Sequence, residues 1–119
     1  MEKEFVPYKL AVKLKELGFD EPCMASRDMN NDENLIQIPL YQQAFRWFRE
    51  KYGLYTEMHK KFDGIGVSII LSEYRYDMRQ DKEVEYHIPK YFGNIYRSYE
   101  EAELACLEKL IEIIESKSE

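Results

Sequence analysis

The sequence predicts one α+β domain over residues 1–119: a two-layer sandwich of three helices on an antiparallel sheet of about four to five strands. Three observations lead to this class. Three segments carry apolar residues at helical spacing, a hairpin with the turn Asp63-Gly64 lies between the second and third, and no Pro-, Gly- or Ser-rich linker divides the chain. The expected order is helix, two strands, helix, two strands with a further short strand, helix.

The first helix is predicted from about Tyr8 to Leu17, where leucines recur at i, i+4 and i+7. Pro7 suits a first turn, since its missing N–H would be unpaired there anyway. Gly18 can take the left-handed conformation that ends a helix, and Phe19 can fold back on the last turn.

A polar cluster at residues 28–34 follows, and its Asn and Asp side chains favour a turn, which predicts a hairpin between residues 23 and 38. Asp28, Asn30 and Asp32 match positions 1, 3 and 5 of an EF-hand loop. Position 6 requires Gly and position 12 a bidentate Glu, and this sequence has Glu33 and Pro39 there. The cluster therefore predicts an ordinary turn.

The second helix is predicted to begin at Pro39 and to end at Gly53, with an apolar arc of about 160°. Its apolar residues are Leu40, Tyr41, Ala44, Phe45, Trp47, Phe48 and Tyr52. Strands are expected at 54–62 and 65–76, and a short one at 84–88. The apolar alternation changes parity at residue 74, which predicts a bulge near Ser72.

The third helix is predicted to begin at Ser98, which forms a capping box with Glu101. Its apolar face approaches about 200°, wider than one packing partner requires. The surplus is expected to be covered either by a homodimer or protein partner, or by the sheet and a neighbouring helix.

The chain is acidic, with 17 Lys+Arg, 23 Asp+Glu and a pI near 5.1, so it lacks the positive field that nucleic-acid binding usually uses. Two cysteines are too few for a disulfide scaffold and favour a reducing cytosol. Residues 1–4 begin no secretory pattern, and no apolar run approaches the roughly 18 residues of a membrane span. We expect a cytoplasmic protein without membrane contact.

Catalytic and metal-binding motifs are not found in the sequence. Cys23, His59, His87 and Cys106 lack the close pairs of a structural zinc site, and Cys106 lies within an apolar helix face, where a thiol is inert. No nucleophile elbow, phosphate-binding loop or H-E-x-x-H occurs. We expect no metal, no cofactor and no catalytic residues. An enzyme would need a deep pocket lined by His59 or His87.

The strongest positive signal is an excess of tyrosine, since five of the ten tyrosines lie within residues 74–97. Tyr and Arg are enriched at protein interfaces because each combines contact area with a polar end. The candidate binding residues are Trp47, Tyr74, Arg75, Tyr76, Tyr86, Tyr91 and Tyr96. An alternative is weak nucleic-acid binding through Lys60, Lys61, Arg75 and Arg79, with neighbouring aromatic side chains stacking on bases.

The stretches 15–23, 41–52 and 99–103 resemble a group of small uncharacterised proteins associated with phages and prophages of gut bacteria. That group carries no established activity, so no functional residues transfer. The resemblance implies a cytoplasmic accessory protein of a mobile element. The leading hypothesis is a non-catalytic protein-binding module that contacts a second copy of itself or a host or phage protein.

Overall fold

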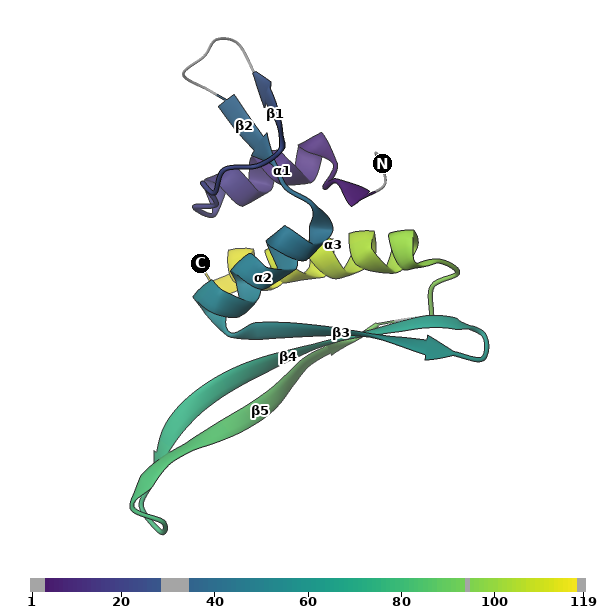
Figure 1. Ribbon diagram of the computed structural model, residues 1–119. Helices are drawn as coiled ribbons and strands as arrows, with labels where there is room; N and C mark the ends of the chain where they lie inside the picture. The colour runs from purple at the N-terminus through teal and green to yellow at the C-terminus, as the bar shows by residue number, and fades with distance from the viewer. Residues whose placement is uncertain (1–3, 29–34, 94, 118–119) are drawn as a thin grey trace.

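The computed structural model describes residues 4–28, 35–93 and 95–117. Within them the elements follow the expected order, and the α+β class is confirmed (Figure 1). The helices and strands are α1 (Tyr8–Glu16), β1 (Ala25–Asp28), β2 (Leu35–Ile38), α2 (Tyr41–Tyr52), β3 (Leu54–Lys61), β4 (Gly64–Asp77), β5 (Lys82–Phe92) and α3 (Tyr99–Lys117).

The strands form two antiparallel sheets where the sequence predicts one. β1 and β2 form a hairpin beside α1, and β3, β4 and β5 form a three-stranded sheet in that order. Figure 1 shows three tiers: α1 with the β1–β2 hairpin, then α2 and α3, then the three-stranded sheet. The two sheets stay apart because the helix pair α2 and α3 lies between them.

The two helix ends predicted at glycines are confirmed. Gly18 has φ +105°, and the N–H of Phe19 donates to the carbonyl of Leu14 at 2.9 Å, so the chain folds back on the last turn of α1. The ring of Phe19 then packs edge-on against Trp47 of α2, with ring centroids 5.5 Å apart. Gly53, with φ +70°, ends α2 and turns the chain directly into β3.

α3 lies at the centre of the molecule and contacts α1, α2, β3 and β4. This arrangement explains its wide apolar face, because the helix is covered on several sides by its own chain. Its buried residues are Ala102, Cys106, Leu107, Leu110, Ile111 and Ile114. Of the two expectations for this face, burial between sheet and helices is therefore the one observed.

The predicted cap of α3 is present in a modified form. The hydroxyl of Ser98 accepts the N–H of Glu101 at 3.2 Å, as in a capping box. The Glu101 carboxylate accepts the N–H of Arg97 at 3.3 Å, one residue before the cap. Two backbone donors at the start of the helix are satisfied in this way.

The bulge predicted near Ser72 lies three residues earlier. The β4–β5 register shifts between Ile69 and Ile70, and the extra residue is Lys90 on β5. It lies next to Pro89, which cannot donate to a strand ladder and is tolerated in an edge strand at a bulge. β5 therefore continues through Pro89 as far as Phe92, although the sequence predicts that the strand ends before this proline.

β4 keeps its alternation throughout, so the change of parity needs no break in the strand. Its odd-numbered residues from Ile65 to Leu71 are buried beneath α3, while α2 packs on the neighbouring β3. The even-numbered residues, including Tyr74 and Tyr76, lie on the opposite side of the sheet. Up to Leu71 the large apolar side chains are the odd-numbered ones, which face the helices. Beyond that point the strand extends past the helices, and the large side chains are the even-numbered tyrosines on the opposite side.

Candidate protein-binding surface

The β4–β5 hairpin extends well beyond the rest of the molecule (Figure 1). β3 pairs with residues 64–71 of β4, whereas β5 pairs with residues 68–77. Residues 72–77 and 82–87 therefore form a two-stranded ribbon with its turn, here called the arm (72–87). At about 3.3 Å per residue, each strand of the arm is about 20 Å long. No core residue lies in the arm.

The side of the arm that continues the helix-free side of the sheet carries two tyrosines, each held by an acidic residue. The hydroxyl of Tyr74, 66% exposed, donates to Glu85 at 2.9 Å, and that of Tyr76, 58% exposed, donates to Asp81. His87 also bonds Glu85. These bonds lower the pKa of Glu85 and raise the pKa of Tyr74. Because the pairs are exposed, they orient the rings more than they stabilise the fold.

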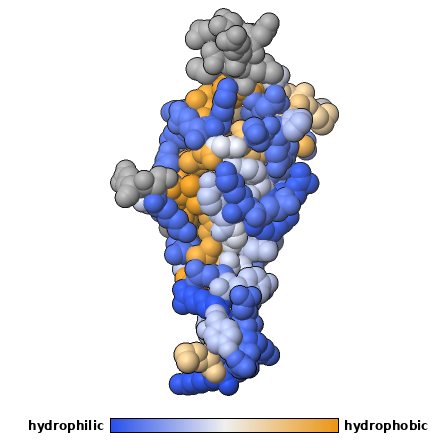
Figure 2. All heavy atoms as spheres, turned by 90° about the vertical axis from the view of Figure 1, so that its left-hand side faces the viewer, coloured by the Kyte–Doolittle hydropathy of each residue, from blue (hydrophilic) through white to orange (hydrophobic). Residues whose placement is uncertain are grey.

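The other side of the arm carries a charged and aromatic cluster. Arg75 donates to Glu73 at 2.7 Å, and its guanidinium lies 5.5 Å from the ring centroid of Tyr86 on the facing strand. Met78, in the turn, is 86% exposed. Figure 2 views the molecule from the side toward which the arm projects and shows a largely hydrophilic arm with a small hydrophobic spot near its end.

The tyrosine side of the arm is continuous with the helix-free side of the main sheet. Among the described elements, no helix or second sheet covers this side (Figure 1). We call it the open face, and the register defines its members. They are Tyr55, Glu57, His59 and Lys61 of β3, Gly64, Gly66, Ser68, Ile70, Ser72, Tyr74 and Tyr76 of β4, and Glu83, Glu85, His87, Pro89 and Phe92 of β5.

The middle of the open face carries exposed aromatic side chains, with Glu57 beside them at the level of Ser68. Phe92, 73% exposed, and Tyr55, 45% exposed, flank β4 at the levels of Ser68 and Ile70. Arg49 of α2 lies 6.0 Å from the Tyr55 ring at the rim. An exposed aromatic surface of this kind typically marks an interaction site on a soluble domain.

The candidate residues divide into three groups. Tyr74, Arg75, Tyr76 and Tyr86 are exposed on the arm, Tyr74 and Tyr76 on the open face and Arg75 and Tyr86 on its other side. Trp47 does not belong to such a surface, because it is only 7% exposed and packs in the hydrophobic core, edge-on against its α2 neighbour Phe48. The prediction that Trp47 belongs to the binding surface is therefore wrong. The prediction failed because Trp47 lies at the edge of the apolar arc of its helix, a position from which exposure cannot be read.

Tyr91 and Tyr96 form the third group, half-buried at the other end of β5. Tyr91 hydrogen-bonds Tyr96, which together with burial raises the pKa of Tyr96 to about 12. The ammonium of Lys109 lies 5.1 Å from the Tyr91 ring centroid, and Tyr96 exchanges backbone hydrogen bonds with Ile65. These contacts fasten the chain between β5 and α3 to the body.

The basic residues named for nucleic-acid binding lie at two ends of the molecule. Lys60 and Lys61 pair with the start of β4, whereas Arg75 and Arg79 lie on the arm. Ten residues of β4 separate the two ends, about 33 Å along the strand. Residues 72–87 contain three basic and five acidic residues, so the arm carries a net charge of −2. A continuous cationic track is therefore not formed.

Neither cysteine is placed as a reactive thiolate. Burial, with Glu103 nearby, raises the pKa of Cys106 to about 12. The pKa of Cys23 is also raised, by burial and by the charge of Glu21. Both effects keep the sulfur protonated, and the two thiols are free.

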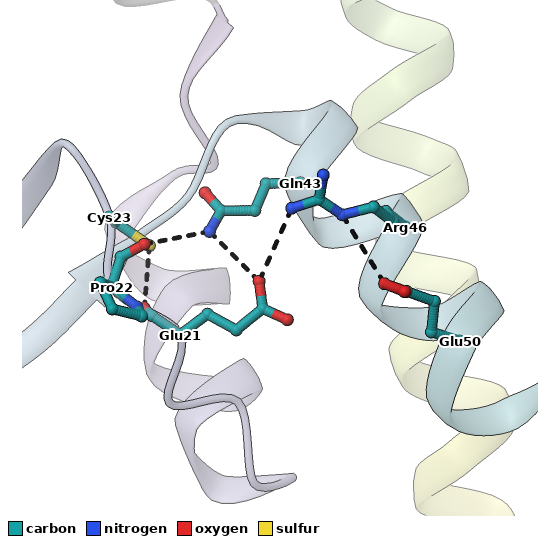
Figure 3. Close-up of polar contacts among 6 residues, drawn as sticks. All are labelled: Glu21, Pro22, Cys23, Gln43, Arg46 and Glu50. Atoms are coloured by element: carbon teal, nitrogen blue, oxygen red, sulfur yellow. Dashed lines mark hydrogen bonds and ion pairs between the residues drawn. The ribbon is translucent and has the colours of Figure 1, made fainter.

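A polar cluster around Cys23 joins the connection between α1 and β1 to helix α2 (Figure 3). The amide of Gln43, on α2, donates to the Glu21 carboxylate at 3.3 Å and to the carbonyl of Pro22 at 3.2 Å. Arg46 lies 4.0 Å from Glu21 and 3.7 Å from Glu50. These contacts hold the connection between α1 and β1 against α2. The thiol of Cys23 donates a hydrogen bond to the backbone carbonyl of Glu21.

His59 and His87 both lie on the open face, and neither lines any of the three best-formed hollows of the described residues. His59 is 3.2 Å from Glu57 and 3.5 Å from the hydroxyl of Ser68. A hollow of about 300 Å³ with an acidic lining lies between α2 and α3. It is lined by Glu4, Leu40, Tyr41, Gln42, Tyr99, Glu100 and Glu103. The deep histidine-lined pocket on which the enzyme hypothesis depends is not among the hollows of the described residues.

Metal-binding clusters and membrane-spanning helices are both absent from residues 4–28, 35–93 and 95–117. No group of three or more His, Cys, Asp or Glu in those ranges could hold a metal ion. No helix there is both long and apolar enough to cross a bilayer. Asn30 and Asp32, which belong to the EF-hand comparison, lie outside the described residues.

The geometry thus defines a small α+β domain with an open sheet face and a projecting arm. Comparison of the chain with protein-family models, with curated proteins and with solved structures finds no match.

Sequence reasoning missed three residues of this surface: Tyr55, Phe92 and Met78. A signal for Tyr55 is present in the sequence, since it alternates with the inward-facing Leu54 on a strand that a hairpin turn joins to β4. Phe92 gives no such signal, because the bulge at Lys90 shifts its side by one residue. Met78 is exposed only because the hairpin extends past the body.

Proposed function

We propose that the chain is a non-catalytic protein-binding module, an accessory protein of phage origin, and that it binds through the open face and the arm. The observation that carries the proposal is the arm itself. A ribbon without core residues presents Tyr74, Tyr76 and Met78 to solvent at the end of an uncovered sheet. The phage origin is supported by the sequence resemblance alone.

The pattern of charges favours contact through the face of the sheet over pairing with its edges. The arm strands alternate tyrosine or valine with charged residues, among them Glu73, Asp77 and Lys82. Charged side chains on exposed strands discourage the addition of another strand. The aromatic side chains of the open face instead supply a large contact area with polar ends, as interface hot spots do.

Photo-crosslinking in cells that produce the chain tests this function. Benzoylphenylalanine in place of Tyr74 is expected to form a covalent adduct with a protein on irradiation. The matched control carries the same group in place of Tyr99, which is 50% exposed at the start of α3 and lies off the open face. Equal adduct yields at both positions, or no protein adduct at position 74, would contradict the proposal. An adduct removed by nuclease would favour the nucleic-acid alternative.

A further inference from the structure

We propose that the acidic hollow between α2 and α3 binds an aliphatic diamine or polyamine, whose ammonium groups are held by carboxylates from two segments of the chain. This site goes beyond the proposed function, because its lining comes from the helices and the segment before α1 and not from the open face. The inference is carried by carboxylates without a counterion, by a buried hydroxyl without a partner, and by the kind of cation that the arrangement suits.

Three carboxylates line the hollow. Glu100 and Glu103 come from the start of α3, and Glu4 comes from the segment before α1. None of the three forms an ion pair within residues 4–28, 35–93 and 95–117. Burial raises the pKa of Glu103, and the charges of Glu100 and Glu4 raise it further. A cation bound in the hollow would relieve this repulsion.

The dipole of α3 explains only part of this cluster. Acidic side chains stabilise a helix within its first turn, where Glu100 and Glu101 lie. Glu103 lies two residues further along and is half-buried. Helix capping therefore accounts for Glu100 but not for the half-buried carboxylate beside it.

Tyr41 supplies an observation that is independent of the acidic residues. Its side chain lines the hollow and is only 5% exposed, yet its hydroxyl has no hydrogen-bond partner among the described residues. Buried polar groups nearly always have a partner. Because no fully enclosed side-chain oxygen of the described residues is without one, this hydroxyl must reach the surface, where the hollow is.

The hydroxyl of Tyr41 is suited to an ammonium ligand. Burial, followed by the charges of Glu103 and Glu108, raises the pKa of Tyr41 to about 12, so the phenol stays neutral. A neutral hydroxyl accepts an N–H bond, and an ammonium group has three N–H donors and no acceptor. The hollow therefore offers this ligand a hydroxyl acceptor beside carboxylates.

The arrangement suits an extended organic cation better than a metal ion. A metal ion needs its carboxylates gathered within coordination distance, and no acidic group of that kind occurs in the described part of the chain. A diamine can instead place one ammonium at the α3 carboxylates and the other at Glu4. Its methylene chain can lie on Leu40 and on the ring of Tyr99, which is 50% exposed. A hollow of about 300 Å³ is of the size that small ligands use.

Calorimetric titration of the purified chain with three probes tests the site, at about 150 mM salt to screen the general attraction of an acidic chain for cations. Putrescine, a four-carbon chain with an ammonium group at each end, is expected to bind once per chain. Butylamine has the same carbon chain with one ammonium group, and Mg²⁺ has the same charge without the length. Both should bind at least about tenfold more weakly than putrescine.

Two substitutions in the hollow separate its parts. Glu103→Gln keeps the shape of the side chain and removes its charge, and Tyr41→Phe removes only the hydroxyl. Each should weaken the binding of putrescine about tenfold. Because this hydroxyl has no partner among the described residues, Tyr41→Phe should not lower the Tm at pH 7, which circular dichroism measures.

The matched control is Glu115→Gln, which removes the same charge from an exposed position near the other end of α3. It should change the dissociation constant by less than about twofold. Glu100→Gln provides a further variant if Glu103→Gln fails to fold, because Glu100 lines the hollow and is exposed. It too should weaken binding.

The absence of any heat of binding up to about 10 mM putrescine would overturn the inference. Equal affinity for Mg²⁺ would also overturn it, since the chain would then attract cations in general. An unchanged affinity in Tyr41→Phe, or a loss in Glu115→Gln as large as that in the hollow variants, would have the same consequence. The photo-crosslink at position 74 judges the proposed function separately.

Discussion

The backbone N–H of Ser72 donates a 2.8 Å hydrogen bond to the carbonyl of Gly53, at the point where β3 begins. Beyond this bond β4 pairs with β5 alone. The body of the molecule therefore ends at Ser72, and the arm begins there.

Removal of the arm should leave the fold intact. Replacing residues 74–85 with Asn-Gly joins Glu73 to its partner Tyr86 by a two-residue turn, a length that suits a hairpin. Because the excised residues contribute nothing to the core, the free energy of unfolding should change by less than about 1 kcal/mol. Urea unfolding followed by circular dichroism measures this change. A loss of several kcal/mol would show that the arm belongs to the folding unit.

The cap of α3 should contribute measurably to stability. Ser98→Ala removes the acceptor of the Glu101 N–H and should lower the free energy of unfolding by about 1 kcal/mol. Ser116→Ala is the control, since that hydroxyl donates to a carbonyl in the last turn of the same helix and is exposed. Its removal should have little effect. Equal losses in the two variants would contradict a capping role for Ser98.

Two glycines two residues apart should respond very differently to alanine. Gly64 has φ +149°, and a methyl group there would lie 2.4 Å from the carbonyl oxygen of Tyr96. At Gly66 the nearest atoms belong to the flexible end of Lys61, which can move. Gly64→Ala should therefore destabilise the chain by more than about 2 kcal/mol, and Gly66→Ala by much less. Thermal unfolding of the two variants measures the difference.

The two thiols should differ in reactivity. A disulfide reagent at pH 8 should label Cys23 in the native chain, slowly because its pKa is raised, and should label Cys106 only after unfolding. Mass spectrometry of the digested protein locates the label. Rapid native labelling of Cys106 would mean that α3 is not packed within the core.

Alkaline pH should destabilise the fold before it ionises the buried groups. Burial raises the pKa of Cys106 from 9.0 to about 12, and that of Tyr41 from 10.0 to about 12. Both groups lose their protons more easily in the unfolded chain. Their contribution to stability is therefore complete below pH 9 and is lost as the pH rises toward 12.

Cys106→Ala separates the share of this thiol from the rest. The thiol can account for at most about 1.4 kcal/mol per pH unit of the loss. The variant should start less stable by about 1 kcal/mol and lose less on going from pH 9 to pH 11. Urea unfolding at the two pH values gives both quantities. An identical loss in both proteins would assign the alkaline transition to other groups.

Much of the fold could be predicted from local patterns. The ends of α1 and α2 at Gly18 and Gly53 and the cap at Ser98 each depend on residues close together in sequence, and each is found. The hairpin turn predicted at Asp63-Gly64 is found one residue earlier, at Phe62-Asp63, because Gly64 already pairs with Lys61. The strand through Pro89 and the bulge beside it were not predicted correctly, because a bulge depends on the pairing partner and not on the strand alone.

Three amphipathic helices, two hairpins and a tyrosine-rich segment could be recognised in the chain alone, because helical and strand periodicities and turn residues act over a few neighbours. The packing of distant segments was needed to show that Trp47 is in the core, that α3 is covered by its own chain, and that Tyr74 and Tyr76 stand on an arm beyond the body. Which face of an element is covered depends on segments far away in sequence. The difference in length between β3 and its neighbour β4 is what leaves the arm exposed.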